Sequence, residues 1–444
     1  MINIGGVLLK RKSQFAAFLI VIVLLVTGCS SSGSNSGSAS NDEKKIELTM
    51  SAWGNPAEIK VYQRALDEYE KQNPNIKVKL IPVPSDNYEQ KLLTQLSGGQ
   101  GNDVFYAGSE TISKLISTGV IADLTDFLDS SSSFVKPEEF SEGMWGPAEL
   151  DGKIYGVSVD ANPYLMYYNK KILEDAGIEK TPQDLYEEGN WNWDTFEKIT
   201  GKIRDAGKKG FVVDNNNEVF FSWVWSNGGQ LYDDNGQYIL EENEKAQEVF
   251  TYLERLIQND HAIYAGSLPK GQGADAMFMS NQVGFINAGR WLTPMFSENK
   301  SLEFDYIPWP TNTENKMEPT SIGVAFMAVN KESKHLEEAM KFMSFYTSEE
   351  GQKVRQTENG NAIPSVTGID ELVHEAKTPD HPAYLIDARD IGRIEDQQTR
   401  IPGLGKEVTD IMDLMYLGKQ DSEKTMKQVS KKVKEIVEKH KQEN

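Results

Sequence analysis

Apolar and polar side chains alternate along the first part of the chain with two different periods. Residues 45–50 alternate strictly, which is the two-residue period of a strand, and segments 76–82 and 103–106 are strand-like as well. Over residues 57–72 the apolar positions recur every three or four residues, as on one face of a helix, and 88–96 repeats this pattern. Strand and helix thus follow each other at the spacing of βαβ units. This order predicts the α/β class, with an open sheet whose strands end in ligand-facing loops.

Further along, the pattern predicts one more strand at 153–159 and several helices. The helices are expected at residues 193–206, 244–258, 331–345 and 423–441. A single hydrophobic core stops growing at roughly 250 to 300 residues, so a chain of 444 residues is expected to form two lobes. The chain holds 39% hydrophobic residues and eight Trp, which is enough to bury a large interior and predicts a globular protein.

The N-terminal segment has the features of a secretion signal. A basic stretch at 10–12 precedes an unbroken apolar run at 15–26, which is shorter than the roughly 20 residues that a membrane-spanning helix needs. The run ends in Val26-Thr27-Gly28-Cys29, which resembles the bacterial lipobox, whose Cys is diacylated and becomes the mature N-terminus. We expect residues 1–28 to be removed and 29–44, rich in Ser and Gly, to form a flexible tether. A plain secretory peptide with an incidental Cys is the alternative.

Charge and cysteine content exclude several classes of protein. Forty-six Lys and Arg against 67 Asp and Glu give a formal charge of −21, which repels nucleic acid and anionic lipid headgroups. One Cys and five scattered His form no Cys-x-x-Cys or His-x-x-His pair, so neither a metal nor another cofactor is predicted. No Gly-x-Ser-x-Gly elbow and no phosphate-binding loop occurs. A pair of glycosidase carboxylates remains open, because that chemistry depends on a separation that sequence does not show.

Several short motifs follow one another along the chain from about residue 45 onward. They are Trp53-Gly54, Gly98 to Phe105, Gly119-Val-Ile-Ala-Asp-Leu, Gly152-Lys-Ile-Tyr-Gly, Tyr167-Tyr-Asn-Lys, Trp191 to Thr200, Asn227-Gly-Gly, Gly284 to Trp291 and Gly323 to Lys331. In this order they resemble the extracellular solute-binding lipoproteins of ABC importers, the family that includes maltose-binding protein, and the resemblance covers about residues 45 to 444.

This resemblance implies a two-lobe periplasmic-binding-protein-like clamshell with several hinge crossovers. One lobe is expected at 45–158 plus 325–375 and the other at 162–321 plus 380–444, with hinges near Asp160 and Gly323. The family captures a carbohydrate, here expected to be an oligosaccharide, and delivers it to the permease subunits of an ABC importer. We therefore expect a monomer that is anchored to the outer face of the cell membrane by the lipid on Cys29.

A sugar offers apolar C–H faces and a rim of hydroxyls, so its receptor needs aromatic rings and short polar side chains. Trp291, preceded by Gly289, matches a stacking Trp of the family, and Gly289 is expected to let the ligand approach the backbone. Trp223 and Trp225 lie in a strand-like segment, from which we assign Trp223 to the site. The predicted ligand-binding residues are Trp53, Asn55, Tyr106, Glu110, Asp160, Asn162, Trp223, Asn287, Arg290 and Trp291.

Alternatives to a neutral oligosaccharide remain open at this point. A guanidinium at Arg290 would pair the carboxylate of a uronate or a sulfate, and Arg389, Arg393 and Arg400 could contribute. A non-sugar solute such as a polyamine would also prefer acids and aromatic rings. The third alternative is a surface-anchored enzyme that degrades polysaccharides, whereas the leading prediction is a receptor without enzymatic activity.

Overall fold

The structure of the protein is a computed structural model that describes residues 45–141, 143–270, 272–357, 360–395 and 397–443. The predicted signal segment, Cys29 and the predicted tether lie outside the described residues. Within the described ranges, no helix combines the length and the apolar character that crossing a membrane requires.

The first sheet has five strands in the order β2-β1-β3-β12-β6. β1 is parallel to β2 and β3, whereas β12 is antiparallel to both β3 and β6. The strand predicted from the alternation at 45–50 is confirmed as β1, and β2 has the predicted bounds. The strands are β1 Ile46–Ala52, β2 Ile76–Pro82, β3 Val104–Ala107, β6 Val157–Pro163 and β12 Ile322–Val329.

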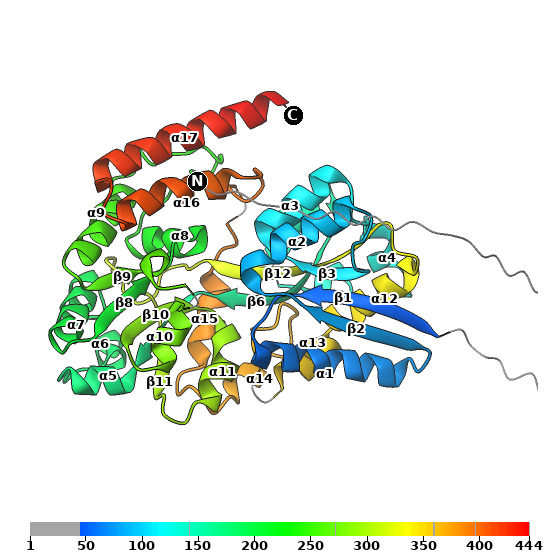
Figure 1. The fold of residues 1–444 in the computed structure, drawn as a ribbon, viewed down its shortest axis with the longest axis horizontal. Helices are drawn as coiled ribbons and strands as arrows, with labels where there is room; N and C mark the ends of the chain where they lie inside the picture. The colour runs from blue at the N-terminus through cyan, green and yellow to red at the C-terminus, as the bar shows by residue number, and fades with distance from the viewer. Residues whose placement is uncertain (1–44, 142, 271, 358–359, 396, 444) are drawn as a thin grey trace, which may run out of the picture. The chain divides into compact units, whose positions relative to one another are not determined.

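The helices that accompany this sheet follow its strands in the chain (Figure 1). They are α1 Pro56–Gln72, α2 Ser85–Ser97, α3 Ser109–Thr118, α4 Thr125–Asp129, α12 Leu336–Thr347 and α13 Glu349–Gln356. The predicted helix at 331–345 thus begins later, because Asn330 and Ser333 use their side chains to bond the backbone of a turn that precedes it. A short hairpin of β4 Glu149–Leu150 and β5 Lys153–Ile154 occupies part of the strand predicted at 153–159.

The second sheet has five strands in the order β11-β7-β10-β8-β9. β8 is parallel to its neighbours β9 and β10, and β7 is antiparallel to β10 and β11. The strands are β7 Leu165–Asn169, β8 Lys209–Val213, β9 Ala262–Tyr264, β10 Val283–Ala288 and β11 Phe304–Ile307. The helices are α5 Lys170–Asp175, α6 Pro182–Glu187, α7 Trp193–Asp205, α8 Asn217–Ser226, α9 Glu244–Gln258, α10 Ala274–Met279, α11 Thr293–Glu298, α14 Glu371–His374, α15 Ala383–Ile391, α16 Leu404–Tyr416 and α17 Ser422–Glu443.

The strand expected around Trp223 and Trp225 is wrong, because this segment is the helix α8. The side chain of Asn216 caps the helix by accepting a hydrogen bond from the backbone N–H of Val219. All eight residues from Val219 to Ser226 are buried. Large apolar residues dominate this buried helix, and only Glu218, Ser222 and Ser226, four residues apart, mark its helical period.

The chain passes between the two sheets more than once. It leaves β6, at the edge of the first sheet, and enters β7 of the second sheet after a single residue, Tyr164. It returns from β11 to β12, and after α13 the later helices pack against the core of the second sheet. In Figure 1 the C-terminal helices α16 and α17, in orange and red, lie side by side, and α17 also contacts α9.

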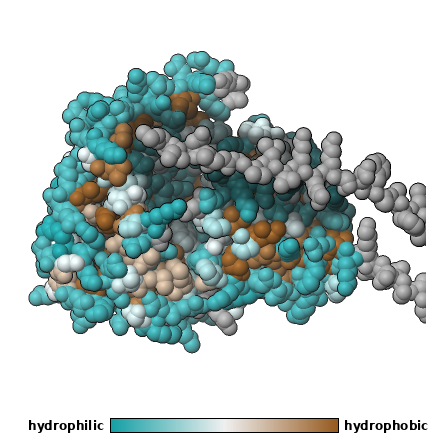
Figure 2. Space-filling view, viewed as in Figure 1, coloured by the Kyte–Doolittle hydropathy of each residue, from teal (hydrophilic) through white to brown (hydrophobic). Residues whose placement is uncertain are grey.

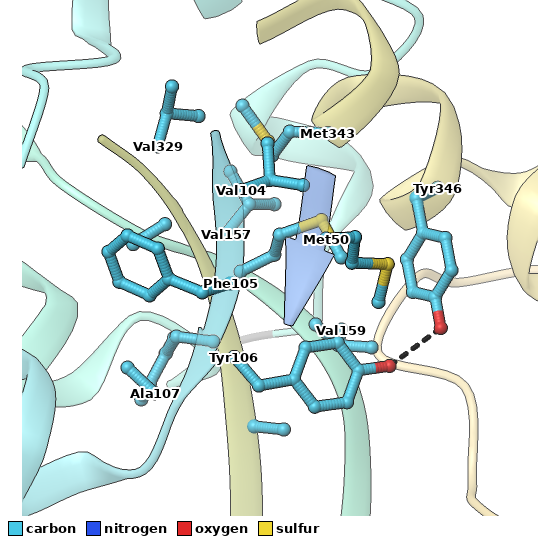
Figure 3. Packing of buried hydrophobic residues seen from close by; sticks show 14 of the residues in the cluster. Met50, Val104, Phe105, Tyr106, Ala107, Val157, Val159, Val329, Met343 and Tyr346 are labelled. Atoms are coloured by element: carbon cyan, nitrogen blue, oxygen red, sulfur yellow. Dashed lines mark hydrogen bonds between the residues drawn. The ribbon is translucent and has the colours of Figure 1, made fainter. Parts of the chain in front are cut away.

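Each sheet has its own hydrophobic core. The core of the first sheet contains Met50, Phe105 and Tyr106, and Figure 3 shows Tyr106 turned toward Tyr346, with 2.7 Å between the two hydroxyl oxygens. Two clusters cover the faces of the second sheet. The surface visible in Figure 2 is mostly hydrophilic, as a chain with 25% charged residues requires.

Candidate functional site

A cavity of about 390 Å³ opens where the two sheets approach each other along β6 and β12. Its wall combines residues of the first sheet and its helices with residues near the start of β7, on α8 and just after β10. The lining residues are Trp53, Glu58, Tyr62, Ser85, Tyr88, Glu89, Tyr106, Gly108, Ser109, Thr111, Asp160, Asn162, Tyr164, Glu218, Trp291, Gly323, Val324, Ala325 and Asn361. Five of the predicted site residues are in this wall: Trp53, Tyr106, Asp160, Asn162 and Trp291.

Aromatic rings line the cavity on the side of the first sheet. Trp53 directly follows β1, and its ring meets Tyr88 and Tyr106 edge to face, with centroids 5.1 and 5.3 Å apart. Tyr62 of α1 packs on Tyr106 at 5.3 Å. The hydroxyl of Tyr88 donates to the carbonyl of Tyr106 at 2.9 Å, which fixes its ring. Rings held by contacts on several sides form a rigid apolar surface.

Two more rings come from the side of the second sheet. Tyr164 and Trp291 pack edge to face with centroids 5.2 Å apart. A Cβ atom at Gly289 would collide with the ring of Trp291. Gly289 therefore makes room for this ring, rather than for a ligand against the backbone as its position in the sequence predicted. The cavity thus has aromatic surfaces on both sides.

Glu58 lies at the start of α1 and is held there by the helix cap. Asn55 is the cap residue: its side-chain oxygen accepts from the backbone N–H of Glu58, and Glu58 accepts from the N–H of Asn55 at 2.9 Å. The hydroxyl of Tyr62 and the amide of Asn361 also donate to Glu58, at 3.2 and 3.3 Å. Burial outweighs these donors and raises the pKa of Glu58 to about 7.

Asp160, in β6, forms an ion pair with a fully buried arginine. Its carboxylate lies 3.5 Å from the guanidinium of Arg355, which also donates to the carbonyl of Val159 at 2.6 Å and stacks over Tyr346 at 4.5 Å. Burial raises the pKa of Asp160 to about 6, although Arg355 and Asn162 oppose the shift. Arg355 therefore anchors Asp160 without itself lining the cavity.

Asn162 connects the two sides of the cavity. Its amide nitrogen donates to Asp160 at 3.3 Å, and its amide oxygen accepts from the backbone N–H of Arg290 at 3.0 Å. These two bonds fix the orientation of the Asn162 amide. They also tie the loop that carries Trp291 to strand β6.

The other five predicted site residues do not line the cavity. Asn55 caps α1, and its amide nitrogen reaches the carbonyl of Trp291 at 3.4 Å. Glu110 accepts from the backbone N–H of Gly403 at 2.9 Å. Trp223 is fully buried in the core of the second sheet, where its ring packs against Trp309. Because this segment is the helix α8 and not a strand, Trp223 points into the core of the second sheet and not into the cavity.

Arg290 and Asn287 are also buried outside the cavity wall. The guanidinium of Arg290 donates to the carbonyl of Ala362 at 2.9 Å, so it serves the backbone and does not face a ligand. Arg290 is therefore no longer an argument for an acidic sugar as the ligand. The side-chain amide of Asn287 is buried at the end of β10, and neither its nitrogen nor its oxygen has a partner within the described chain.

Sequence reasoning missed several residues of the wall, chiefly Glu58, Tyr62, Tyr88, Tyr164 and Glu218. Glu58 and Tyr62 lie on α1, where an acid in the first turn and an aromatic ring on the apolar face are ordinary features of a helix. Tyr164 directly precedes β7 and begins an aromatic run that continues with Tyr167 and Tyr168 inside the strand, which is the one sequence signal that could have identified it. The carboxylate of Glu218, on α8, forms no hydrogen bond or ion pair with another side chain of the described ranges, and burial raises its pKa.

Comparisons with known proteins place this architecture in a family. The arabinooligosaccharide-binding protein of Bacillus subtilis (strain 168) is 26% identical over 81% of this chain and 79% of its own length. The galactooligosaccharide-binding protein of the same organism is 21% identical over 81% of this chain and 82% of its own length.

Solved structures share the fold. The ABC substrate-binding protein of Listeria monocytogenes in complex with cycloalternan superposes with a TM-score of 0.78, at 23% identity over 89% of this chain and 99% of that chain. Maltose-bound MalE3 of T. maritima gives a TM-score of 0.72, at 20% identity over 88% of this chain and 99% of that chain. These likenesses confirm the predicted two-lobe α/β fold. The family model of the bacterial extracellular solute-binding proteins matches residues 53–353, more than half of the sequence, and the chain therefore belongs to this family, as its motifs indicated.

Proposed function

We propose that the protein is an extracellular receptor that binds a carbohydrate, an oligosaccharide, in the cavity between its two lobes and leaves it chemically unchanged. The observation that carries this proposal is the wall of the cavity. Six aromatic rings from both sides face a space of about 390 Å³, together with carboxylates and amides in fixed orientations. This volume lies within the about 300–1,000 Å³ typical of ligand pockets.

The chemistry of the wall suits a sugar. Aromatic rings such as Trp53 and Trp291 cover the apolar C–H faces of pyranose or furanose rings. Asp160 and Asn162 are positioned to pair hydroxyls, and a charged acceptor forms the stronger kind of hydrogen bond. The names of the Bacillus subtilis relatives, which specify arabino- and galactooligosaccharides, support the same class of ligand.

Ligand binding is proposed to close the two lobes, 45–158 plus 325–375 and 162–321 plus 380–444. A ligand that touches Trp53 on one side and Trp291 on the other binds the closed state better than the open one, and this difference in affinity shifts the population. The closed form is the one that the permease of an ABC importer would recognise. The lipid on Cys29 is proposed to hold this monomer on the outer face of the membrane, since a single acylated site on a tether leaves the body free to move.

Thermal unfolding in the presence of neutral oligosaccharides tests the proposal. Arabino-, galacto- and malto-oligosaccharides form the first panel, and a ligand at 100 times its Kd should stabilise the fold by about 2.7 kcal/mol. Trp291→Ala is expected to reduce this stabilisation to about 1 kcal/mol at the same ligand concentration, because it should weaken binding by about 2 kcal/mol. Trp145→Ala serves as the matched control, because Trp145 is a half-buried Trp outside the cavity. If no carbohydrate shifts the melting temperature, or if Trp291→Ala responds like the parent, the proposed site is wrong.

Two further measurements separate this receptor from the alternatives. Incubation with oligosaccharides should release no new reducing ends, whereas a hydrolase would release them. Small-angle X-ray scattering should show a smaller radius of gyration with saturating ligand. A radius that does not fall would contradict closure even if the sugar binds.

A further inference from the structure

The formal charge that lines the cavity is entirely negative. Of the described residues in its wall, four carry a carboxyl group and none is Lys, Arg or His. Amides and hydroxyls can pair the hydroxyls of a neutral sugar without any net charge. What matters is therefore whether each carboxylate has a counter-charge within the protein.

Asp160 has such a counter-charge. Arg355 lies 3.5 Å from it, is fully buried and is held in place by Val159 and Tyr346. The pair is neutral as a unit. Asp160 therefore does not require a charged ligand.

Glu58 has no counter-charge among the residues that the structure describes. Its side chain is 6% exposed, and its three partners in the described chain, the backbone N–H of Asn55, the hydroxyl of Tyr62 and the amide of Asn361, are all uncharged. A buried carboxylate without a cation is unfavourable even when it is hydrogen-bonded. A cation that enters the cavity would remove this penalty at the position where the ligand binds.

The surroundings of Glu58 suit an ammonium group. Tyr62 donates its hydroxyl to Glu58, and its ring packs on Tyr106, which in turn packs on Trp53. Aromatic faces attract cations through their quadrupole, most strongly in a desolvated site. On the opposite side, the carboxylate of Glu218 lines the same cavity without a side-chain partner in the described ranges. Acidic groups thus face the ligand from both lobes.

We infer that the ligand contains an amino sugar whose protonated amino group pairs with the carboxylate of Glu58. This inference rests on the proposed carbohydrate-binding function and narrows it to a chemical class. It also excludes uronates, because a carboxylate on the ligand would meet four carboxyl groups in the wall and no cation. Glu218 and Glu89 add to the negative potential that draws the ammonium into the cavity.

Matched pairs of sugars that differ only in the charged group test the inference. Glucose and glucosamine, galactose and galactosamine, and cello-oligosaccharides and fully deacetylated chito-oligosaccharides each exchange a hydroxyl for an ammonium at C2. Calorimetry with the full chain is expected to show at least tenfold tighter binding of the aminated member in the pair whose ring and linkage fit. The N-acetylated sugars, which keep the nitrogen but lose the charge, should bind no better than the neutral ones.

Glu58→Gln is the informative variant, since it keeps the shape of the side chain and removes its charge. It should remove the preference, so that the aminated and the neutral member of a pair bind with similar affinity. Glu68→Gln, on the same helix but outside the cavity wall, is the control and should keep the preference.

The possible outcomes distinguish this inference from the proposed function. Neutral sugars that bind as tightly as their aminated partners overturn the amino-sugar inference and leave the carbohydrate receptor intact. The same conclusion follows if Glu58→Gln retains the preference, or if no aminated sugar binds at all. Binding of spermidine but of no sugar overturns the proposed function as well, because the cavity would then be a site for a simple amine.

Discussion

Replacing Glu58 by Gln is expected to stabilise the unliganded protein at neutral and alkaline pH. The buried carboxyl has its pKa raised from the ordinary 4.5 to about 7, with burial as the largest cause. The folded state therefore holds this proton more tightly than the unfolded state does. The resulting stability is fully present below about pH 4.5 and is lost as the pH rises through about 7.

The size of the effect follows from the interval between the two pKa values. From 4.5 to about 7, at about 1.36 kcal/mol for each pH unit, Glu58 withdraws about 3 kcal/mol from the free energy of unfolding. Gln cannot ionise, so above pH 7 Glu58→Gln should regain most of this free energy of unfolding. Below pH 4.5 the variant should equal the parent or fall slightly below it, because its NH₂ group faces donors that now bond a carboxyl oxygen.

Urea denaturation of parent and variant at pH 5 and pH 8 measures the effect, with fluorescence and circular dichroism followed in parallel. Asp160 and Asp214 also have raised pKa values, about 6 and about 7, so the parent loses stability with pH for more than one reason. The difference between variant and parent isolates Glu58, provided that both unfold in one transition. Glu68→Gln is the control, since hydrogen bonds from Gln72 and Lys71 lower the pKa of Glu68 and the variant should therefore give no gain at pH 8.

The reasoning is refuted if the advantage of Glu58→Gln does not grow between pH 5 and pH 8. A constant difference would mean that Gln changes packing or hydrogen bonding and that the charge of Glu58 carries no penalty. Loss of the pH-dependent gain on addition of an aminated sugar would, by contrast, agree with an ammonium that pairs with the carboxylate.

Four other changes test separate parts of the structure. Arg355→Met leaves Asp160 buried without its partner and should lower the free energy of unfolding by about 3–5 kcal/mol, as measured by urea denaturation; a loss below 1 kcal/mol would show that the pair is not needed. Trp223→Ala should cost about 3–5 kcal/mol through a cavity in the second core, with calorimetric affinity for sugar unchanged at a temperature where the variant is folded; weakened binding would place it in the site after all. Trp291→Ala should weaken sugar binding by about 2 kcal/mol in calorimetry while the melting temperature stays close to that of the parent, and unchanged affinity would remove it from the site. Cys29→Ala should release the protein from membranes in cell fractionation, and a variant that stays bound would contradict the lipid anchor.

Periodic patterns predicted the parts of the fold that are amphipathic. The strand at 46–52 and the helix at 56–72 each bury one face, and the sequence shows this as alternation or as a three-to-four-residue period. Helix α8 was mistaken for a strand because residues 219–226 are buried and mostly apolar, and its two serines are only a weak mark of the helical period. Local pattern is informative only where one side of an element meets water.

The candidate site could be predicted only in part, for a related reason. Trp53 and Trp291 stand at the ends of strands, where loops face the ligand, and their positions in the chain suffice to suggest them. Arg290 is adjacent to Trp291, but its guanidinium donates to the backbone carbonyl of Ala362. This contact depends on the tertiary packing of residue 362, which the sequence does not show. Glu58 looks like an ordinary acid in a helix cap. Only the packing of Asn361 and Tyr62 around it reveals that it is buried and faces the cavity.

The position of β12 has a consequence for the order in which the protein folds. β12 lies between β3 and β6, so the first sheet cannot be completed until residues 322–329 join it. Every strand of the second sheet precedes these residues in the sequence. Until then β3 and β6 each present an unpaired edge, the kind of surface that joins to other chains and aggregates. The second sheet is built from the continuous stretch 165–307 and has no such gap. Assembly is therefore expected to start in the middle of the polypeptide, and the first sheet, which holds the first three strands of the described chain, is expected to be completed last.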